Sequence, residues 1–267
     1  MTQSIETVRT PLFVPANRPE RFSKAAASGA DSIILDLEDA VAADAKDVAR
    51  NALTCDFTEL PVIVRINAAD TAWHEKDLHA IAKLPVAAVM LPKAETSEAV
   101  KKVVDALDGN VPIIALIETA LGMENVRQIA ATKGVARLAF GSVDYCADLG
   151  CSHLRDVLLH ARCEMVKGSR LAGIAAPIDG VTTALDDLMI SFEDAIHARD
   201  LGFTGKMCIH PKQIASVTKA FMPSEAEVVW ANKILSSGDG AISVDGEMVD
   251  EPVRMRARAI LARASVA

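Results

Sequence analysis

Short apolar runs recur along the chain as far as about residue 210, and segments with helical spacing of apolar residues lie between them. Eight of these runs have the length of a strand: residues 11–15, 32–37, 61–66, 86–91, 111–117, 136–142, 171–177 and 205–210. They are continuously apolar, as parallel strands covered on both faces are. Eight strand–helix units predict an α/β fold, a TIM (β/α)8 barrel, with a doubly wound open sheet as the structural alternative.

The alternation stops after about residue 222. Residues 224–235 and 251–264 have helical patterns, and Pro252 falls in the first turn of the second one. The glycine-bearing segment 240–250 between them predicts a loop or a hairpin. We therefore expect a barrel catalytic domain over residues 1–222 and a C-terminal helical extension over residues 223–267. The extension is a packing element, a lid, or an arm that contacts a neighbouring subunit.

Composition narrows the class of protein further. The chain has 267 residues, 51% of them hydrophobic, and a net charge of −8, which argues against nucleic acid as a partner. The polar N-terminus argues against a secretory signal, and no apolar run approaches the ~20 residues of a membrane helix. Five scattered cysteines without a CxxC pair argue against a disulfide framework and a zinc site. These features predict a cytoplasmic protein with reduced thiols.

Polar side chains follow each apolar run, where a barrel would gather them on one rim. They are Asn17, Arg18, Asp36, Glu38, Asp39, Arg65, Asn67, Lys93, Glu118, Asp144, Asp179 and His210. A purely structural barrel does not need such convergence, although strand ends are polar in any case because they leave the core.

Glu118 and Asp144 are the best candidates for cation ligands. Each follows an apolar strand, and the two strands are expected to be neighbours. Mg²⁺ commonly takes one or two carboxylates and completes its octahedral shell with water and substrate oxygens. The alternative is that both acids serve helix N-termini, where negative charge is favourable. Asp148 competes with Asp144 for the ligand role.

The segment after the second strand places three acids, Asp36, Glu38 and Asp39, within four positions. They either order water around a cation or form structural ion pairs, the latter being the plainer interpretation. Arg65, at the end of the third strand, either grips a substrate carboxylate or pairs with one of these acids. A basic group of Arg18, Arg21 and Lys24 suits a phosphate or diphosphate, unless it is simply a solvated helix surface.

Other nucleophiles and nucleotide motifs add little. Ser142 and Cys146 have no evident base partner in the sequence, which argues against nucleophilic catalysis. His210 is expected to be a structural hydrogen-bonding residue. The chain has neither a G-x-G-x-x-G nor a Walker A pattern.

Six motifs together carry a family resemblance that spans nearly the whole chain in order. They are "LFVPANRPERFSKAAASGADSIILDLEDAV", "VRIN", "MLPKAE", "IETALG", "FGSVDYCADLG" and "GKMCIHPKQI". The sequence resembles the citrate lyase beta-subunit-like family of the HpcH/HpaI aldolase group, to which malyl-CoA and citramalyl-CoA lyases are related.

The resemblance implies a TIM barrel with a divalent-metal site, usually Mg²⁺ with Mn²⁺ as an alternative. It implies cleavage or formation of a carbon–carbon bond between an acetyl-CoA-type enolate and an α-keto acid. Glu118 and Asp144 would be the metal ligands, with Glu118 also beside the substrate, and Arg65 would bind the keto-acid part.

The same resemblance assigns further roles. Glu38 and Asp39 would order water at the metal, and Arg18 and Lys24 would help hold the coenzyme A of the substrate. Asp250, in "GEMVDEP", would reach an adjacent subunit as a catalytic acid or base, since family members are commonly homotrimers or larger assemblies. Two other functions stay open: an aldolase acting on a free hydroxy-keto acid, and a beta subunit acting on an acyl-carrier-protein thioester. The identity of the keto acid is also open.

Overall fold

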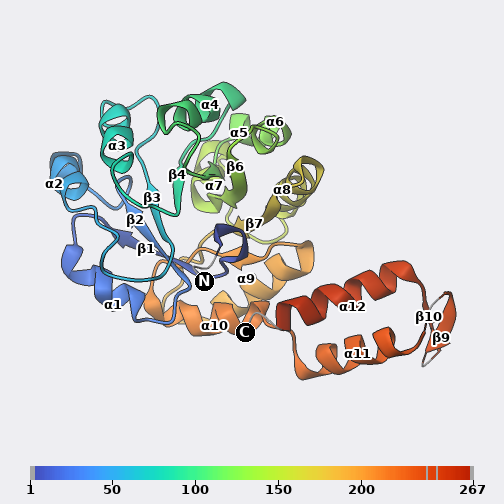
Figure 1. Ribbon diagram of the computed structural model, residues 1–267. Helices are drawn as coiled ribbons and strands as arrows, with labels where there is room; N and C mark the ends of the chain where they lie inside the picture. Colours follow the sequence, from blue (N-terminus) through green and yellow to red (C-terminus); the bar gives the residue numbers. More distant parts are fainter. Residues whose placement is uncertain (1–3, 239, 245, 265–267) are drawn as a thin grey trace. The chain divides into compact units, whose positions relative to one another are not determined.

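The structure is a computed structural model that describes residues 4–238, 240–244 and 246–264. Eight parallel strands follow one another in the order β1 to β8 in a single sheet (Figure 1). The sheet returns on itself, because Cys208 N–H donates to Pro11 O and Phe13 N–H donates to Cys208 O, each at 2.9 Å. The prediction of a TIM barrel is therefore confirmed.

The strands lie close to their predicted positions. They are β1 (Pro11–Pro15), β2 (Ser32–Asp36), β3 (Val62–Arg65), β4 (Ala88–Leu91), β5 (Ile113–Ile117), β6 (Val135–Phe140), β7 (Ala175–Asp179) and β8 (Gly205–Lys206). The seventh strand begins later than predicted, at Ala175. Leu171 and Ala172 still belong to the preceding helix, which ends at Gly173 with φ 70°. Only glycine adopts this left-handed conformation without steric cost. Ser142, expected at the end of the sixth run, instead opens a helix.

Helices connect the strands, and several begin at a side-chain cap. The first ten are α1 (Phe22–Ala26), α2 (Lys46–Asn51), α3 (His74–Ile81), α4 (Ser97–Ala106), α5 (Ala120–Glu124), α6 (Val126–Ala130), α7 (Ser142–Leu149), α8 (Leu159–Ala172), α9 (Leu188–Leu201) and α10 (Pro211–Phe221). Thr96 caps α4 by accepting a hydrogen bond from Ala99 N–H at 3.1 Å. This satisfies one of the backbone donors that a helix N-terminus leaves free.

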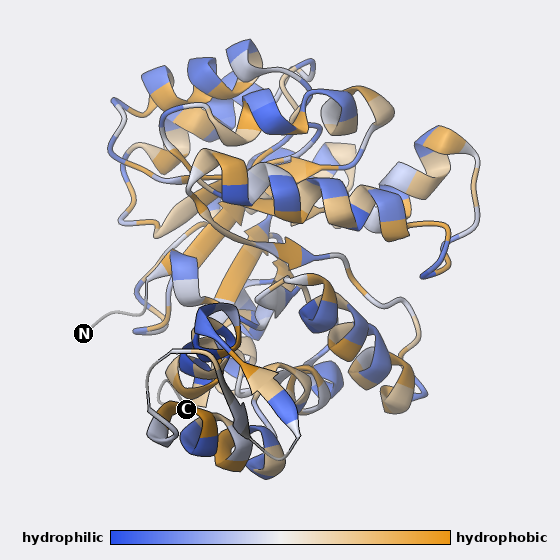
Figure 2. Ribbon diagram, turned by 90° about the vertical axis from the view of Figure 1, so that its right-hand side faces the viewer, coloured by the Kyte–Doolittle hydropathy of each residue, from blue (hydrophilic) through white to orange (hydrophobic). Residues whose placement is uncertain are grey.

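Apolar side chains fill the inside of the barrel. Ile34, Ile63, Met90 and Leu116 belong to one buried cluster, which Ile5 of the short 3₁₀ helix η1 (Ile5–Thr7) joins. Figure 2 shows the strands as an apolar centre, with hydrophilic residues spread over the surrounding helices. Because the interior is packed, the barrel is not a pore, and chemistry is confined to its rims.

The chain divides into two compact units, residues Met1–Thr218 and Lys219–Ala267. The second unit contains α11 (Glu225–Ser236), a hairpin of β9 (Ile242–Val244) and β10 (Glu247–Val249), and α12 (Glu251–Ala264). Ala231, Ile234, Val249, Ala257 and Ile260 form a small core of its own. The predicted helices and hairpin are thus present, while the role of this unit as a lid or arm stays a prediction.

Among the described residues, no helix combines the length and the apolar character needed to cross a membrane.

Candidate active site at the carboxyl ends of the strands

Strand periodicity explains how charged residues come to face the barrel interior at one rim. Side chains two residues apart on a strand point to the same face. Ile34 and Ile63 lie in the interior cluster, and Asp36 and Arg65 follow them by two positions. Leu116 precedes Glu118 in the same way. The apolar interior therefore ends in a charged layer at the carboxyl ends of β2, β3 and β5.

This layer lines a cavity of about 380 Å³. Residues from several strand ends contribute to it: Asp36, Asp39, Arg65, Glu118, Ser142, Asp144 and Thr183, with apolar groups such as Phe13, Leu116, Phe140, Met207 and Ile209. The structure therefore brings Arg65, Glu118, Asp144 and Asp39 into one cavity. A concave site with few converging polar groups is the usual form of a ligand or active site.

Arg65 and Asp36 form a bidentate ion pair within the charged layer. Their Cα atoms are register partners on β2 and β3. Arg65 Nε donates to Asp36 Oδ1 and Arg65 Nη2 donates to Asp36 Oδ2, both at 2.7 Å. Burial lowers the pKa of the guanidinium, but Asp36 and its neighbouring acids raise the pKa above its ordinary value. The structural ion pair is therefore present, and it holds the guanidinium at the cavity wall.

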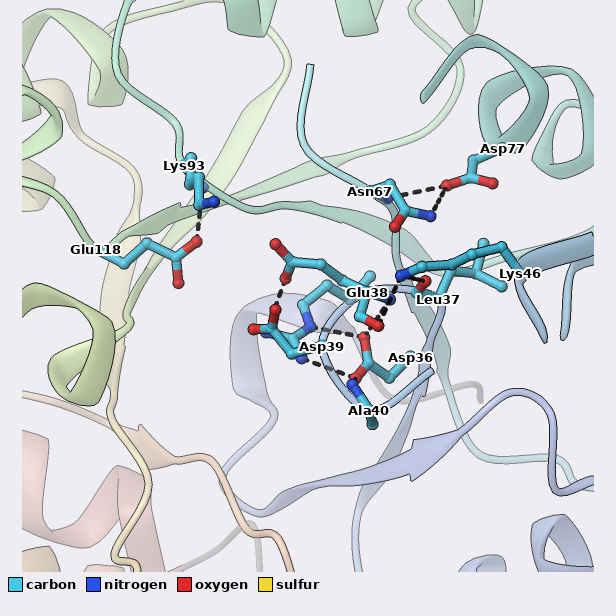
Figure 3. A network of polar contacts seen from close by, with 11 residues as sticks. Asp36, Leu37, Glu38, Asp39, Ala40, Lys46, Asn67, Asp77, Lys93 and Glu118 are labelled. Carbon is cyan, nitrogen blue, oxygen red and sulfur yellow. Dashed lines mark hydrogen bonds and ion pairs between the residues drawn. The ribbon is translucent and has the colours of Figure 1, made fainter. Parts of the chain in front are cut away.

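The same guanidinium is the nearest cation to the other acids of this segment. Arg65 Nη1 lies 3.0 Å from Glu38 Oε2 and 3.5 Å from Asp39 Oδ2. Burial raises the pKa of Glu38 to about 7, an effect that Arg65 only partly offsets. Figure 3 shows these acids together, with Lys46 bonded to the Leu37 and Glu38 carbonyls. Arg65 thus forms ion pairs with all three acids of this segment.

Glu118 is held at the cavity wall by the backbone. Its Oε1 accepts a hydrogen bond from Lys93 N–H at 2.8 Å (Figure 3), and Lys93 has φ +46°. Burial, together with the nearby Glu38 and Asp144, raises the pKa of Glu118 to about 8. A Cβ on Gly141 would collide with the Glu118 Cβ and Oε2, so this glycine leaves the room that the carboxyl group occupies.

The helix-cap alternative does not describe Glu118, because Thr119 caps α5 by accepting from Gly122 N–H at 3.1 Å. Asp144 lies in the first turn of α7 and lines the cavity. Asp148, its competitor, instead accepts from Ala120 N–H at 2.7 Å. The cavity therefore contains Glu118 and Asp144 but not Asp148.

Two carboxylates at a cavity with open volume fit Mg²⁺ chemically, because this ion takes few protein ligands and keeps water and substrate oxygens. Among the described residues, no group of three or more His, Cys, Asp or Glu side chains could enclose a metal. The donor set thus suits an open catalytic site better than a closed structural one.

A second cavity of about 430 Å³ adjoins the first, since Phe13 and Ile209 line both. Arg21 and Lys24 contribute its basic groups, and His210 lines it as well. Arg18 is separate from it, because its exposed guanidinium pairs with Glu20 at 2.7 Å. The structure thus brings Lys24, but not Arg18, to a cavity beside the charged layer.

Three other strand-end residues have structural partners. Asn67 donates to Asp77 Oδ2 through its backbone and side chain, at 2.9 and 2.6 Å. Asp179 is fully buried between Arg162 and Lys206, at 2.8 and 3.0 Å. His210 Nδ1 accepts from Lys212 N–H at 3.1 Å, which agrees with the expected structural role.

The expectation that Ser142 has no base partner was wrong. His153 Nε2 lies 2.9 Å from Ser142 Oγ. The two residues are eleven positions apart and are connected by α7 and the loop after it. No fixed spacing in the sequence therefore indicates the pair. Cys146 is buried, and burial raises the pKa of its thiol to about 11, which agrees with an unreactive thiol.

Asp250 belongs to the second unit, where it precedes α12. Its Oδ1 accepts from Val253 N–H at 3.4 Å, as an N-cap side chain does. The assignment of Asp250 to a neighbouring subunit's site stays a prediction.

TIM-barrel enzymes have their active sites at the carboxyl ends of the strands, and this chain has a carboxylate-lined cavity there. Comparison with known proteins specifies the family. Residues 9–211 match the family model described as HpcH/HpaI aldolase/citrate lyase, and residues 176–267 match a C–C bond lyase of the TIM-barrel fold. The chain therefore belongs to the HpcH/HpaI aldolase/citrate lyase family, and it is a carbon–carbon lyase.

Relatives of this chain are similar over almost their full length. A citrate lyase subunit beta-like protein of Mycobacterium tuberculosis is 40% identical over 96% of this chain and 95% of its own. A (3S)-malyl-CoA thioesterase of Cereibacter sphaeroides is 34% identical over 99% of this chain and 97% of its own. The crystal structure of CitE from M. tuberculosis with magnesium, acetoacetate and coenzyme A has a TM-score of 0.88 and 39% identity, covering 98% of this chain and 100% of that one.

Proposed function

We propose that this chain cleaves, or in reverse forms, the carbon–carbon bond of a β-hydroxyacyl-CoA such as malyl-, citramalyl- or citryl-CoA. The products are an acyl-CoA, typically acetyl-CoA, and an α-keto acid. The proposal rests on one observation: Glu118, Asp144 and Arg65 line the same cavity at the carboxyl ends of the strands. The magnesium, coenzyme A and acetoacetate bound by the similar CitE support this choice of substrate class.

Glu118 and Asp144 would hold the Mg²⁺, with Mn²⁺ as a substitute. When bound, this ion would stabilise negative charge on substrate oxygens as a Lewis acid. Glu118 is suited to the task because Lys93 N–H already fixes one of its oxygens. Glu38 and Asp39 would order water molecules around that ion, at the side where both also meet Arg65.

Arg65 would bind the keto-acid part of the substrate. Its guanidinium carries five N–H donors, and the two hydrogen bonds to Asp36 leave others available at the cavity. Because Asp36 fixes the orientation of the group, little side-chain entropy is lost when it binds a carboxylate. Positive charge at this place would also stabilise the developing keto-acid oxygen.

The coenzyme A part would lie on the side of β1 and β8. Lys24 and Arg21 line the cavity there, which adjoins the charged layer through Phe13 and Ile209. Arg18 would have to release Glu20 to contribute. At the reacting carbon, Asp250 of a neighbouring subunit in a homotrimer or larger assembly would deliver the proton to the thioester enolate.

Hydrolysis of the thioester is a second candidate, because a relative that aligns over 99% of this chain is a (3S)-malyl-CoA thioesterase. The two functions differ in their products. Lysis releases a keto acid and keeps the thioester, whereas hydrolysis releases free coenzyme A and no keto acid.

A turnover assay on the purified chain separates these functions. We would offer both enantiomers of malyl-CoA, with citramalyl-CoA and citryl-CoA, and follow keto acid and free thiol in parallel with Mg²⁺ or EDTA. The proposal expects keto acid without an equivalent of thiol, and only with the metal. Thiol alone would favour hydrolysis. No product from a folded, metal-loaded chain would favour a free hydroxy-keto acid or a carrier-protein thioester as substrate.

A further inference from the structure

Ser142 and His153 connect the active-site cavity to a second polar cavity. Ser142 is 1% exposed and lines the first cavity, and its Oγ lies 2.9 Å from His153 Nε2. His153 is exposed and lines a neighbouring cavity of about 600 Å³ together with Arg155 and Asp194. Thr183 lines both cavities. A buried hydroxyl at the reaction site is thus bonded to an imidazole that reaches solvent.

The proposed reaction needs a proton acceptor that the assigned residues do not supply. When a β-hydroxyacyl-CoA is cleaved, its hydroxyl loses a proton and its enolate carbon gains one. Asp250 is assigned to the carbon. Because the hydroxyl oxygen ends on the keto acid and the new C–H bond ends on the acyl-CoA, the two proton transfers occur at different atoms and call for separate groups.

The charged groups at the cavity wall are otherwise engaged. Asp36 is bonded to Arg65 through both of its oxygens, and Asp39 lies beside the same guanidinium. Glu118 and Asp144 are the proposed metal ligands, and a ligand carboxylate is a poor proton acceptor. Among the described residues that line the cavity, Ser142 is the hydroxyl group with a nitrogen base within hydrogen-bonding distance.

We propose that Ser142 and His153 form a relay that accepts the hydroxyl proton of the substrate, which rests on the proposed lyase function. The substrate O–H bond breaks as a new O–H bond forms at Ser142 Oγ. The original Ser142 proton passes to His153 Nε2, and the electron pair left on the substrate oxygen becomes the C=O bond as the C–C bond breaks. His153 then releases the proton to solvent, while the enolate takes its proton from Asp250.

The surroundings of both residues suit this relay. Ser142 is the first residue of α7, and a Cβ on Gly180 would collide with its Oγ, so the glycine leaves space for the hydroxyl. Burial lowers the pKa of His153, as do Arg162 and Lys206, while Asp194 and Asp179 act in the opposite direction. The net direction favours a neutral imidazole, which is the form that accepts a proton.

Two truncations test the relay. Ser142→Ala and His153→Ala are each expected to lower kcat about 100-fold, the lower end of the usual contribution of a positioned acid–base group. KM and the affinity for the keto acid, measured by calorimetry, should stay within about twofold. Ser152→Ala and His160→Gln, at exposed positions nearby, are matched controls and should retain wild-type turnover.

Rescue by added imidazole distinguishes a relay from a merely structural contact. His153 is exposed beside a cavity, so its truncation leaves the core intact and space for a small base. Imidazole should restore turnover to His153→Ala but not to Ser142→Ala or to the double variant. Wild-type kcat in either single variant, an equal loss of keto-acid affinity, or a defect in His153→Ala that imidazole leaves unchanged would overturn the relay. An inactive wild-type chain would instead count against the lyase function itself.

Discussion

Arg65 holds Asp36 by two hydrogen bonds of 2.7 Å between neighbouring strands of the barrel. Both side chains are almost completely buried. If one of them is removed, water therefore cannot solvate the charge of the other. Their pairing fixes the orientation of the Arg65 guanidinium at the cavity wall. The strength of this pair can be compared directly with that of the weaker contact between Arg65 and Asp39.

Replacing Asp36 by Asn should destabilise the protein by about 3 to 5 kcal/mol, because it leaves a buried guanidinium without its main counter-ion. Asp39→Asn is the matched control, since its side chain is 65% exposed and 3.5 Å from Arg65. We expect that variant to change the free energy of unfolding by less than about 1 kcal/mol. Urea denaturation measures both values, and equal effects would contradict the dominant role of Asp36.

Gly141→Ala should abolish metal binding without a backbone conformational penalty. Gly141 has φ −79°, which alanine adopts freely, but its Cβ would collide with the Glu118 carboxyl group. The control is Gly168→Ala on α8, where the new Cβ meets its nearest neighbour at 3.8 Å. That substitution should preserve Mg²⁺ affinity and leave stability unchanged or slightly higher. Normal Mg²⁺ affinity in Gly141→Ala, by calorimetry, would show that Glu118 is not the ligand.

The metal-free protein should lose stability as the pH rises. Burial raises the pKa of Glu38 to about 7 and that of Glu118 to about 8, so both groups resist ionisation in the folded state. A carboxyl group with a raised folded-state pKa contributes full stability below its unfolded pKa of about 4.5 and loses it through the folded pKa. With EDTA, Tm should therefore fall between pH 5 and pH 8.

Two comparisons check this pH dependence. Mg²⁺ should restore Tm most strongly at pH 8, because the ion favours the charged carboxylates. Glu118→Gln should flatten the metal-free profile, whereas Asp108→Asn, at an exposed turn position outside the cavity lining, should follow the wild type. A metal-free Tm that rises over this range would contradict the raised pKa values.

Asp250→Asn should bind Mg²⁺ normally but lose at least about 100-fold in turnover. Asparagine is as good an N-cap as aspartate, so α12 and the stability of the protein should be preserved. Mixing subunits carrying Asp250→Asn with subunits carrying Glu118→Gln tests where Asp250 acts. If it serves a neighbouring subunit, the mixture should regain activity that neither parent has. Absence of regain in mixed oligomers would place Asp250 in its own subunit's site or outside catalysis.

The barrel could be predicted because continuous apolar runs indicate buried parallel strands and the segments between them have the apolar spacing of helices. Glu118 and Asp144 could also be proposed, since polar residues after such runs gather at one rim. What the sequence left open was pairing. The ion pair of Arg65 with Asp36 depends on strand register, and Ser142 with His153 on the path of a loop. Asp148 could be separated from Asp144 only when its bond to Ala120 N–H was seen.

We expect cleavage to depend on a metal ion that Glu118 and Asp144 hold. Titration of Mn²⁺ into the wild type, Glu118→Gln, Asp144→Asn and Asp148→Asn, followed by spin resonance and paired with keto-acid release, tests it most directly. We expect one tight site in the wild type and in Asp148→Asn, and loss of both binding and cleavage in the other two variants. Metal binding and turnover that survive in Glu118→Gln and Asp144→Asn would show that these two carboxylates are not the metal ligands.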